Sequence, residues 1–286
     1  MDYRFKESVN VIRFPEERIE ENRGYKDCCE AQLKLASSTD TDSYKNDLIG
    51  VFVKISDVSD TVNFVISRCD DGLPLPNLGD VLNAPQDALL QGFIFDCRQY
   101  LITYGRGKYN VDIEYTISGV TGSVRWGQYD LEEFSISRAA GTVRIRSKFQ
   151  SKYQKLNADF TDSNFEDTIR FNGFFGEIQP ITEINNLINK GRISEKITRE
   201  NLNEYTLKTD PISYTLSSQI ILALLNENEL YISDHNAGNH NYFLFDVPVQ
   251  LIETPELEYY RRGRPAKMVV KFGDRRLIDK TYYNKQ

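Results

Sequence analysis

Between residues 48 and 149 the sequence repeats one pattern: short runs rich in β-branched and aromatic residues, separated by polar or glycine-containing turns. Residues 48–55 (LIGVFVKI) and 61–69 (TVNFVISRC) are two such runs, and residues 111–119 (VDIEYTISG) alternate apolar and polar side chains. A period of two places the apolar side chains on one face of a strand. Strands at this spacing favour a sandwich or a barrel, so we predict an N-terminal β-sandwich-like domain over residues 1–155.

Two further segments belong to this first domain. The long apolar run LLQGFIFDCRQYLITY, residues 89–104, predicts one or two buried strands, and the run GTVRIRSKF, residues 141–149, predicts the last strand of the series. Residues 155–167 are polar and rich in turn formers, which is typical of a junction between domains.

The remaining residues, 156–286, predict a smaller α+β domain. Residues 169–180, 242–253 and 266–274 read as strands, whereas residues 197–210 favour neither a helix nor a strand. Residues 182–192 predict a short helix, with Thr182 as its N-cap and Gly191 as its end.

One prominent helix is expected near residues 215–227. Leu216, Ile220, Ala223 and Leu224 recur there at helical spacing, which gives a single apolar face. The fold class we predict is therefore mainly β, with a smaller α+β part.

Composition narrows the classes of function. The chain of 286 residues is 40% hydrophobic and 27% charged, with a net charge of −7. An acidic surface repels phosphate, which disfavours specific nucleic-acid binding and anionic membranes. The sequence contains no run of about 18 apolar residues, so no membrane span is predicted. The start, MDYRFKESVN, has no apolar signal-peptide region. We therefore expect no membrane partner and synthesis in a cytoplasm.

The cysteines and carboxylates give no metal signature. The four cysteines, Cys28, Cys29, Cys69 and Cys97, have no C-x-x-C spacing, so zinc is disfavoured and reduced, mostly buried thiols are expected. Residues 40–42 (DTD) with Asp47 could form a calcium loop, but the glycine and final glutamate of the EF-hand spacing are absent, which disfavours calcium. We expect no cofactor.

Both histidines lie in the stretch SDHNAGNHNY, residues 233–242. Asp234, His235 and His240 could supply metal ligands or acid–base groups. Their spacing is not that of a helical zinc site, however, and Gly238 together with the asparagines favours a turn. A polar loop is the favoured interpretation, and a metal or catalytic site is the alternative.

Two basic clusters are candidate interface sites, because Arg and Tyr are enriched where protein partners dock. The alternative for both is an ordinary solvated surface. The first cluster shares one face of a strand, and the second lies in the segment YYRRGRPAK. Their residues are Arg144, Arg146 and Lys148 in the first, and Tyr259, Tyr260, Arg261, Arg262 and Arg264 in the second.

The single tryptophan, Trp126, could stack on a sugar, although a place in the core is the favoured interpretation. No motif supports a catalytic residue, since G-x-S-x-G and phosphate-loop patterns are missing from the sequence.

Two segments suggest a family. They are residues 104–149, YGRGKYNVDIEYTISGVTGSVRWGQYDLEEFSISRAAGTVRIRSKF, and residues 171–213, which run on to LYISDHNAGNHNYFLFDVPVQL. Together they resemble virion structural proteins of tailed bacteriophages, especially those of the tail, neck or baseplate. The resemblance implies a non-enzymatic ring subunit that contacts copies of itself and other virion tail or neck proteins. It also implies a location in the virion, after assembly in the host cytoplasm.

Two other classes of function remain open from the sequence. One is a carbohydrate-binding or host-receptor-binding module, with Trp126 and tyrosines as its platform. The other is a metal-dependent hydrolase built on Asp234, His235 and His240. Our expectation is a ring-forming structural protein without enzymatic activity.

Overall fold

The fold was analysed in a computed structural model. The structure describes residues 31–55, 59–117, 119–153, 158–176, 179–188, 194–212, 216–217, 220–221, 224, 229–236, 244–253, 255–259, 266–274 and 279–282. For residues 117, 153, 179–188, 194–202, 257–259, 266 and 279–282 the description is of the backbone only. The described residues are mainly in β-strands, as the sequence predicts, and none of their helices is long and apolar enough to cross a membrane.

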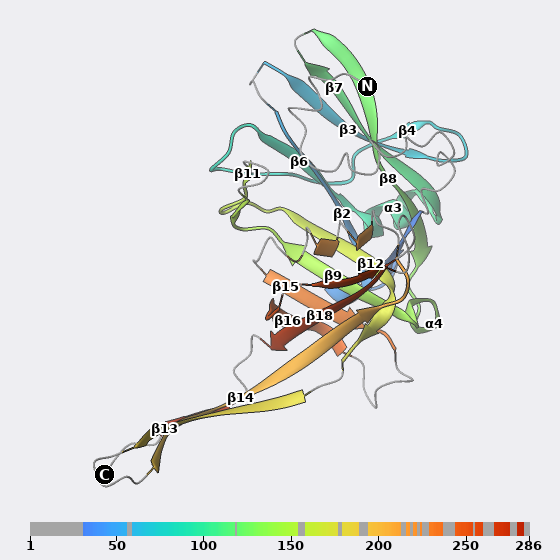
Figure 1. Ribbon diagram of the computed structural model, residues 1–286. Helices are drawn as coiled ribbons and strands as arrows, with labels where there is room; N and C mark the ends of the chain where they lie inside the picture. Colours follow the sequence, from blue (N-terminus) through green and yellow to red (C-terminus); the bar gives the residue numbers. More distant parts are fainter. Residues whose placement is uncertain are drawn as a thin grey trace.

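The first unit contains two sheets that share one hydrophobic core (Figure 1). The five-stranded sheet has the order β1-β8-β7-β3-β4, and the three-stranded sheet has the order β2-β6-β5. Strand β1 pairs parallel with β8, and the other pairs are antiparallel. The strands are β1 (Gln32–Ala36), β2 (Leu48–Lys54), β3 (Thr61–Arg68), β4 (Pro74–Leu75), β5 (Gly79–Val81), β6 (Leu90–Asp96), β7 (Gly107–Ile117) and β8 (Val120–Glu133).

The apolar run at residues 89–104 forms a strand and then a helix, instead of strands alone. Strand β6 ends at Asp96, whose carboxylate accepts hydrogen bonds from the backbone amides of Arg98 and Gln99 and so caps α3 (Cys97–Tyr104). Gly105, with φ of 82°, ends the helix. An apolar run cannot by itself distinguish a buried strand from a buried helix, and here the aspartate cap decides. Two shorter helical segments are η1 (Ser43–Lys45) and α4 (Ile136–Ala139).

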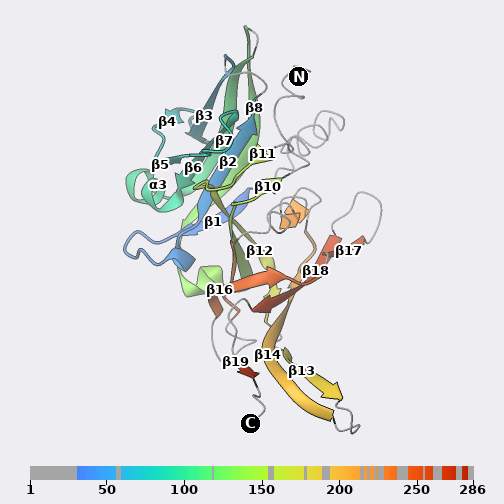
Figure 2. The ribbon, with the colours of Figure 1, turned by 90° about the vertical axis from the view of Figure 1, so that its left-hand side faces the viewer.

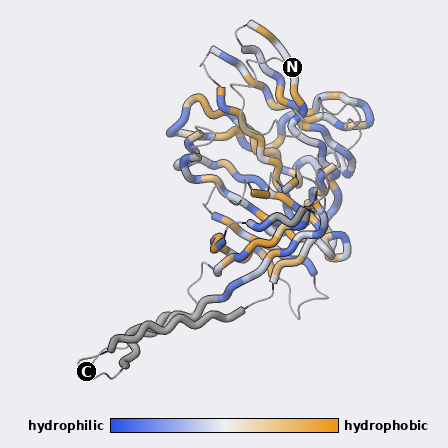
Figure 3. The backbone as a smooth tube through the Cα atoms, viewed as in Figure 1, coloured by the Kyte–Doolittle hydropathy of each residue, from blue (hydrophilic) through white to orange (hydrophobic). Residues whose placement is uncertain are grey.

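The second unit is a closed six-stranded antiparallel barrel with the ring order β14-β12-β9-β15-β16-β18. Pairing of β14 with β18 closes the ring, and closure removes the sheet edges that would otherwise be exposed. The barrel strands are β9 (Thr142–Lys148), β12 (Glu166–Phe175), β14 (Ser194–Thr209), β15 (Glu229–Asp234), β16 (Leu244–Leu251) and β18 (Ala266–Asp274). Figure 3 shows hydrophobic and hydrophilic residues alternating along the strands of both units.

The two units do not divide at residue 155. Strand β9 precedes this residue but belongs to the barrel. The chain then returns to the first core with Phe149, Phe160 and Phe165, next to the short pair β10 (Lys152–Tyr153) and β11 (Ala158–Asp159). It enters the barrel again as β12.

An arm extends from the barrel (Figures 1 and 2). Beyond Phe175 the chain continues as β13 (Gln179–Ile188), which pairs with the outer part of β14, and β19 (Asp279–Tyr282) pairs with the other side of β14. The helix predicted at residues 182–192 is wrong, because pairing along β14 imposes a strand whatever the local capping signals.

The prominent helix expected near residues 215–227 is not confirmed as one element. The residues described there are Leu216, Ser217, Ile220, Ile221 and Leu224, and all five are helical. Ile220 and Leu224 are fully buried in the barrel core, so the predicted apolar face is used. Ala223 lies outside the described residues. Strand β17 (Glu256–Tyr259) pairs with β18 beside the ring.

Candidate functional site

The basic strand face is the first candidate that the structure tests. Arg144, Arg146 and Lys148 alternate along β9 with the buried Val143 and Ile145, as predicted. Strand β9, however, lies between β12 and β15 and is no sheet edge. Exposure rises along the strand, because Arg144 is 0% exposed whereas the side chain of Lys148 is 34% exposed. The expectation of a surface docking residue is therefore wrong for Arg144.

The guanidinium of Arg144 is engaged entirely within the chain. Its Nε donates to Asp47 Oδ1 at 2.7 Å, and its Nη1 donates to Asp246 Oδ1 at 3.0 Å. Its Nη2 donates to the carbonyl oxygens of Ser43 and Asn46, at 2.9 and 3.0 Å. These contacts join β9 and β16 of the barrel to the segment that precedes β2 of the first unit.

Asp47 is the centre of this buried charge network. The residue is 0% exposed, and its Oδ2 accepts from Arg170 Nε at 2.9 Å and from the backbone amide of Leu35 at 2.8 Å. Burial by itself raises the pKa of Asp47, but the charges of Arg170 and Arg144 outweigh burial and hold the pKa well below its usual value. The carboxylate therefore stays ionised and pairs with two buried arginines, and Asp246 supplies a second negative charge beside Arg144.

Lys34 is the third buried cation of the network. The side chain is 1% exposed, and Nζ donates to the carbonyl oxygens of Leu48, at 2.7 Å, and of Thr168. It also lies 3.7 Å from Asp167 Oδ1. Because Lys34 and Leu48 belong to the first unit and Thr168 to β12, this lysine links the two units as well. We name Lys34, Asp47, Arg144, Thr168 and Arg170 the interunit network.

The interunit network escapes prediction from the sequence. Its hydrogen-bonded partners lie between 97 and 134 residues apart, so no local pattern relates them. The available signal is a charged residue between two apolar residues, and Lys34, Arg144 and Arg170 all show it. Such a pattern indicates a strand with a polar face, and it does not identify the partner.

The outer residues of the basic face have neighbours of their own. Arg146 forms an ion pair with Glu166 at 3.2 Å, and its guanidinium carbon lies 4.3 Å from the ring centre of Tyr231. Lys148 Nζ lies 3.6 Å from Glu229. Both side chains are partly exposed, so both remain candidates for a partner contact.

The second basic cluster is largely untested. Tyr259 ends β17, where its backbone pairs with Ala266. Tyr260, Arg261, Arg262 and Arg264 lie outside the described residues. In the sheet order, β15, β16 and β18 separate β9 from β17, so Tyr259 is not on a strand next to the first cluster.

His235 has the surroundings of a core residue. It is 2% exposed, and its ring centre lies 5.6 Å from that of Phe134 and 5.4 Å from that of Phe245. Its Nε2 is buried without a hydrogen-bond partner among the described residues. Burial, reinforced by the positive charge of Arg170, lowers the pKa of His235 to about 4. A neutral imidazole closed off from solvent cannot exchange protons with a substrate.

Asp234 organises the loop that follows β15. Its Oδ2 accepts from the backbone amide of Phe175 at 2.8 Å, and its Oδ1 accepts from the amide of Asn236 at 2.7 Å. His240 lies outside the described residues. Within the described ranges, no three His, Cys, Asp or Glu side chains are grouped as metal ligands.

The remaining single-residue candidates lie in or near the first core. Trp126 is 8% exposed and packs edge-on against Phe52, which confirms the core interpretation. Cys97 is buried, and burial raises its thiol pKa. Cys69 is a partly exposed free thiol that contacts Asn110 Oδ1 at 3.2 Å. Cys28 and Cys29 lie outside the described residues.

Comparisons with known proteins identify no relative. No protein-family model, no curated protein and no solved structure matches the chain.

Proposed function

We propose that the protein is a non-enzymatic structural subunit that forms an oligomeric ring in the tail, neck or baseplate of a tailed bacteriophage. The observation that supports assembly into an oligomer is the β13–β14–β19 arm, which continues the barrel strands away from the barrel. The phage setting rests on the sequence resemblance of residues 104–149 and 171–213.

The arm has the form of an assembly element. Residues 194–203 of β14 lie beyond its pairing with the barrel strands β12 and β18, and at about 3.3 Å per residue they reach about 33 Å. A ribbon of so few strands is marginally stable alone in water. A partner surface would stabilise it.

The arm also offers strand edges. Among the described strands, β13 pairs only with β14, so its other side presents unpaired backbone amides and carbonyls. Such an edge recruits a further strand from another chain. Arm and receiving surface are different parts of the molecule, and a heterologous contact of this kind closes into a ring when the rotation between subunits allows it.

The interunit network supports the same function. Contacts of Asp47 and Lys34 hold the first unit against barrel strands β9 and β12, and β12 leads directly into the arm. A ring needs one fixed angle between successive subunits. An arm fixed relative to both units would set that angle. In the proposed setting, other virion tail or neck proteins dock on the ring faces.

The test is an armless variant in which an Asn-Gly turn replaces residues 177–203 and joins Gly176 to Glu204. The pairs Phe175–Leu207 and Gly173–Thr209, which hold β12 to β14, remain. A control variant replaces only the tip, residues 189–193, with the same turn. Light scattering over a concentration series should give a defined multimer for the wild type and the control, and a monomer for the armless variant. The barrel should fold in all three, as circular dichroism would show.

Two results would contradict the proposal. An armless variant that forms the same multimer would exclude the arm as the assembly element. A wild-type chain that is monomeric at every concentration would exclude self-assembly of the isolated protein into a ring.

The two alternative functions, sugar binding at Trp126 and metal-dependent hydrolysis at His235, both depend on a residue that is buried. Trp126 is buried and cannot serve as a sugar platform, and His235 is buried and neutral. A carbohydrate function would therefore need another surface.

A further inference from the structure

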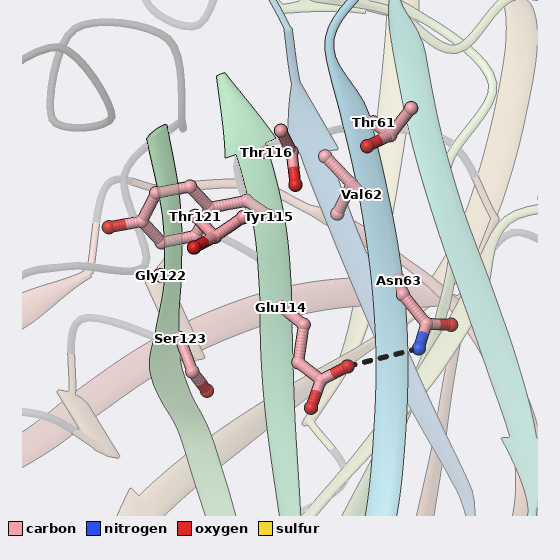
Figure 4. Close-up of a pocket in the computed structure, with 9 residues that line it drawn as sticks. All are labelled: Thr61, Val62, Asn63, Glu114, Tyr115, Thr116, Thr121, Gly122 and Ser123. Atoms are coloured by element: carbon pink, nitrogen blue, oxygen red, sulfur yellow. Dashed lines mark hydrogen bonds between the residues drawn. The ribbon is translucent and has the colours of Figure 1, made fainter. Parts of the chain in front are cut away.

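A hollow lies at one end of the five-stranded sheet, far in sequence from the arm (Figure 4). Its volume is about 460 Å³, which is within the range of small-ligand pockets. Strands β3, β7 and β8 contribute the lining. The lining side chains are Thr61, Val62, Asn63, Glu114, Tyr115, Thr116, Thr121 and Ser123, together with Gly122.

Six of these side chains form two rows across the three strands. The strand register places Thr61 opposite Thr116 and Thr116 opposite Thr121, and the row of Asn63, Glu114 and Ser123 follows two residues away. With strands about 4.8 Å apart and about 3.3 Å per residue, the two rows cover an area of about 10 by 7 Å.

The rows lie on the face that turns away from the core. Phe64, Ile113 and Val124 alternate with them and are buried, whereas Asn63 and Glu114 are exposed. Every polar side chain in this lining is a hydroxyl, an amide or a carboxylate.

Tyr115 lies between the two rows in sequence, but its side chain is on the opposite, core-facing side of the sheet and is 7% exposed. Tyr115 extends across β8 at Gly122, where a Cβ atom would lie 2.3 Å from the Tyr115 hydroxyl oxygen (Figure 4). Only glycine at this position leaves room for the ring. A ligand on the outward face of the sheet therefore meets the hydroxyl, amide and carboxylate groups of the two rows.

We propose that this hollow binds a neutral saccharide. Serine and threonine hydroxyls both donate and accept hydrogen bonds, as sugar hydroxyls do, and the Glu114 carboxylate accepts from two directions. Asn63 Nδ2 donates to Glu114 Oε2 at 3.3 Å, which orients both side chains over the hollow. The lining has a negative charge and no cation, so it disfavours phosphorylated, sulfated or sialylated ligands.

The experiment is isothermal titration calorimetry of the full chain with maltohexaose, cellohexaose and mannohexaose, and with a heparin-derived hexasaccharide as the anionic probe. At least one neutral oligosaccharide should bind, and the anionic probe should not. The double variant Asn63→Ala/Glu114→Gln should weaken binding at least about tenfold, because it removes a charged acceptor and its partner. Thr121→Val, which keeps the side-chain volume, should weaken it less.

The matched control is the double variant Gln250→Ala/Glu256→Gln, which makes similar changes at exposed positions of β16 and β17. It should bind as the wild type does. Binding of the anionic probe alone, no binding of any neutral probe, or neutral binding that the Asn63/Glu114 variant leaves unchanged would each overturn the proposal. Because these positions are remote from the arm in sequence and sheet order, the variants should keep the native mass of the wild type, and the ring proposal is tested separately.

Discussion

The hydroxyl of Thr168 holds the main chain of Leu48 by two hydrogen bonds. The Leu48 amide donates to Thr168 Oγ1 at 2.8 Å, and the same hydroxyl donates to the Leu48 carbonyl oxygen at 2.9 Å. Strand β2 pairs with β6 on one side, so a side chain of β12 takes the place that a neighbouring strand would have on the other. The side chain of Thr168 in the barrel is thus hydrogen-bonded to the main chain of β2 in the first unit.

Replacement of Thr168 with valine should weaken this junction. Valine has nearly the same shape but no hydroxyl. The amide and the carbonyl of Leu48 would therefore lose their hydrogen-bond partner, and the side chain at position 168 is fully buried. The expected loss in the free energy of unfolding is about 2 kcal/mol. Urea denaturation would measure it. Thr168→Ser keeps the hydroxyl and should lose clearly less, and equal losses for the two variants would show that the hydroxyl is not the stabilising group.

Asp47→Asn should be far more destabilising than an exposed substitution of the same kind. The amide carries no charge, so Arg170 would be buried without the Asp47 carboxylate, and Arg144 would keep only its ion pair with Asp246. Breaking a buried ion pair in this way costs about 3–5 kcal/mol. The control is Asp40→Asn, which removes an exposed partner of Lys45 and should unfold close to the wild-type midpoint. If both variants unfold alike, the interunit network does not hold the units together.

The sequence predicts the strands better than their partners. Residues 61–69 and 111–119 supply β3 and β7, whose alternating apolar residues are visible within each run, and residues 48–55 supply β2, a β-branched and aromatic run that is buried on both faces. Both patterns are local to the run. No comparable local pattern shows to which of the two units a strand belongs. Strand β9 joins the barrel because its backbone pairs with β12 and β15, and β15 begins 81 residues after the end of β9.

The failures have physical reasons. Residues 182–192 carry good helix-capping residues, but β14 offers a continuous row of backbone partners, and long-range pairing overrides local propensity. Arg144 looks like a surface cation because a single strand cannot show that Asp47 and Asp246 will meet it inside the fold. The sequence thus places Arg144, Arg146 and Lys148 on one face of a strand, but it does not show how deeply each side chain is buried.

Two glycines with positive φ should respond very differently to alanine. Gly79 has φ of 142°, and a Cβ atom there would lie 2.0 Å from the carbonyl oxygen of Ile94, within the β5–β6 pair. Gly72 has φ of 67° and open space around it. Gly72→Ala should cost about 1 kcal/mol through backbone strain alone. Gly79→Ala should cost more than about 3 kcal/mol, because the strand backbone must also move. Thermal unfolding of the two variants would check this order, and similar midpoints would contradict it.

His235 should make the protein less stable in mild acid. Its pKa is about 4 in the folded protein and 6.5 in an ordinary setting, so the unfolded chain binds the proton more tightly. The free energy of unfolding should therefore fall as the pH decreases from 6.5 to 4, and it should then level off. One pKa unit corresponds to about 1.4 kcal/mol, so the full loss is about 3 kcal/mol, of which about 2 kcal/mol appears by pH 5.

The variant His235→Phe isolates this effect. Phenylalanine can pack between Phe134 and Phe245, and it has no proton to bind. His240 is present in both chains, so the difference between them reports His235 alone. Urea denaturation at pH 7 and pH 5 should show that the wild type loses about 2 kcal/mol more than the variant over this interval. Equal losses in the two chains would mean that His235 is protonated as readily in the folded state as in the unfolded state, which its contacts with two aromatic rings and its nearness to Arg170 do not allow.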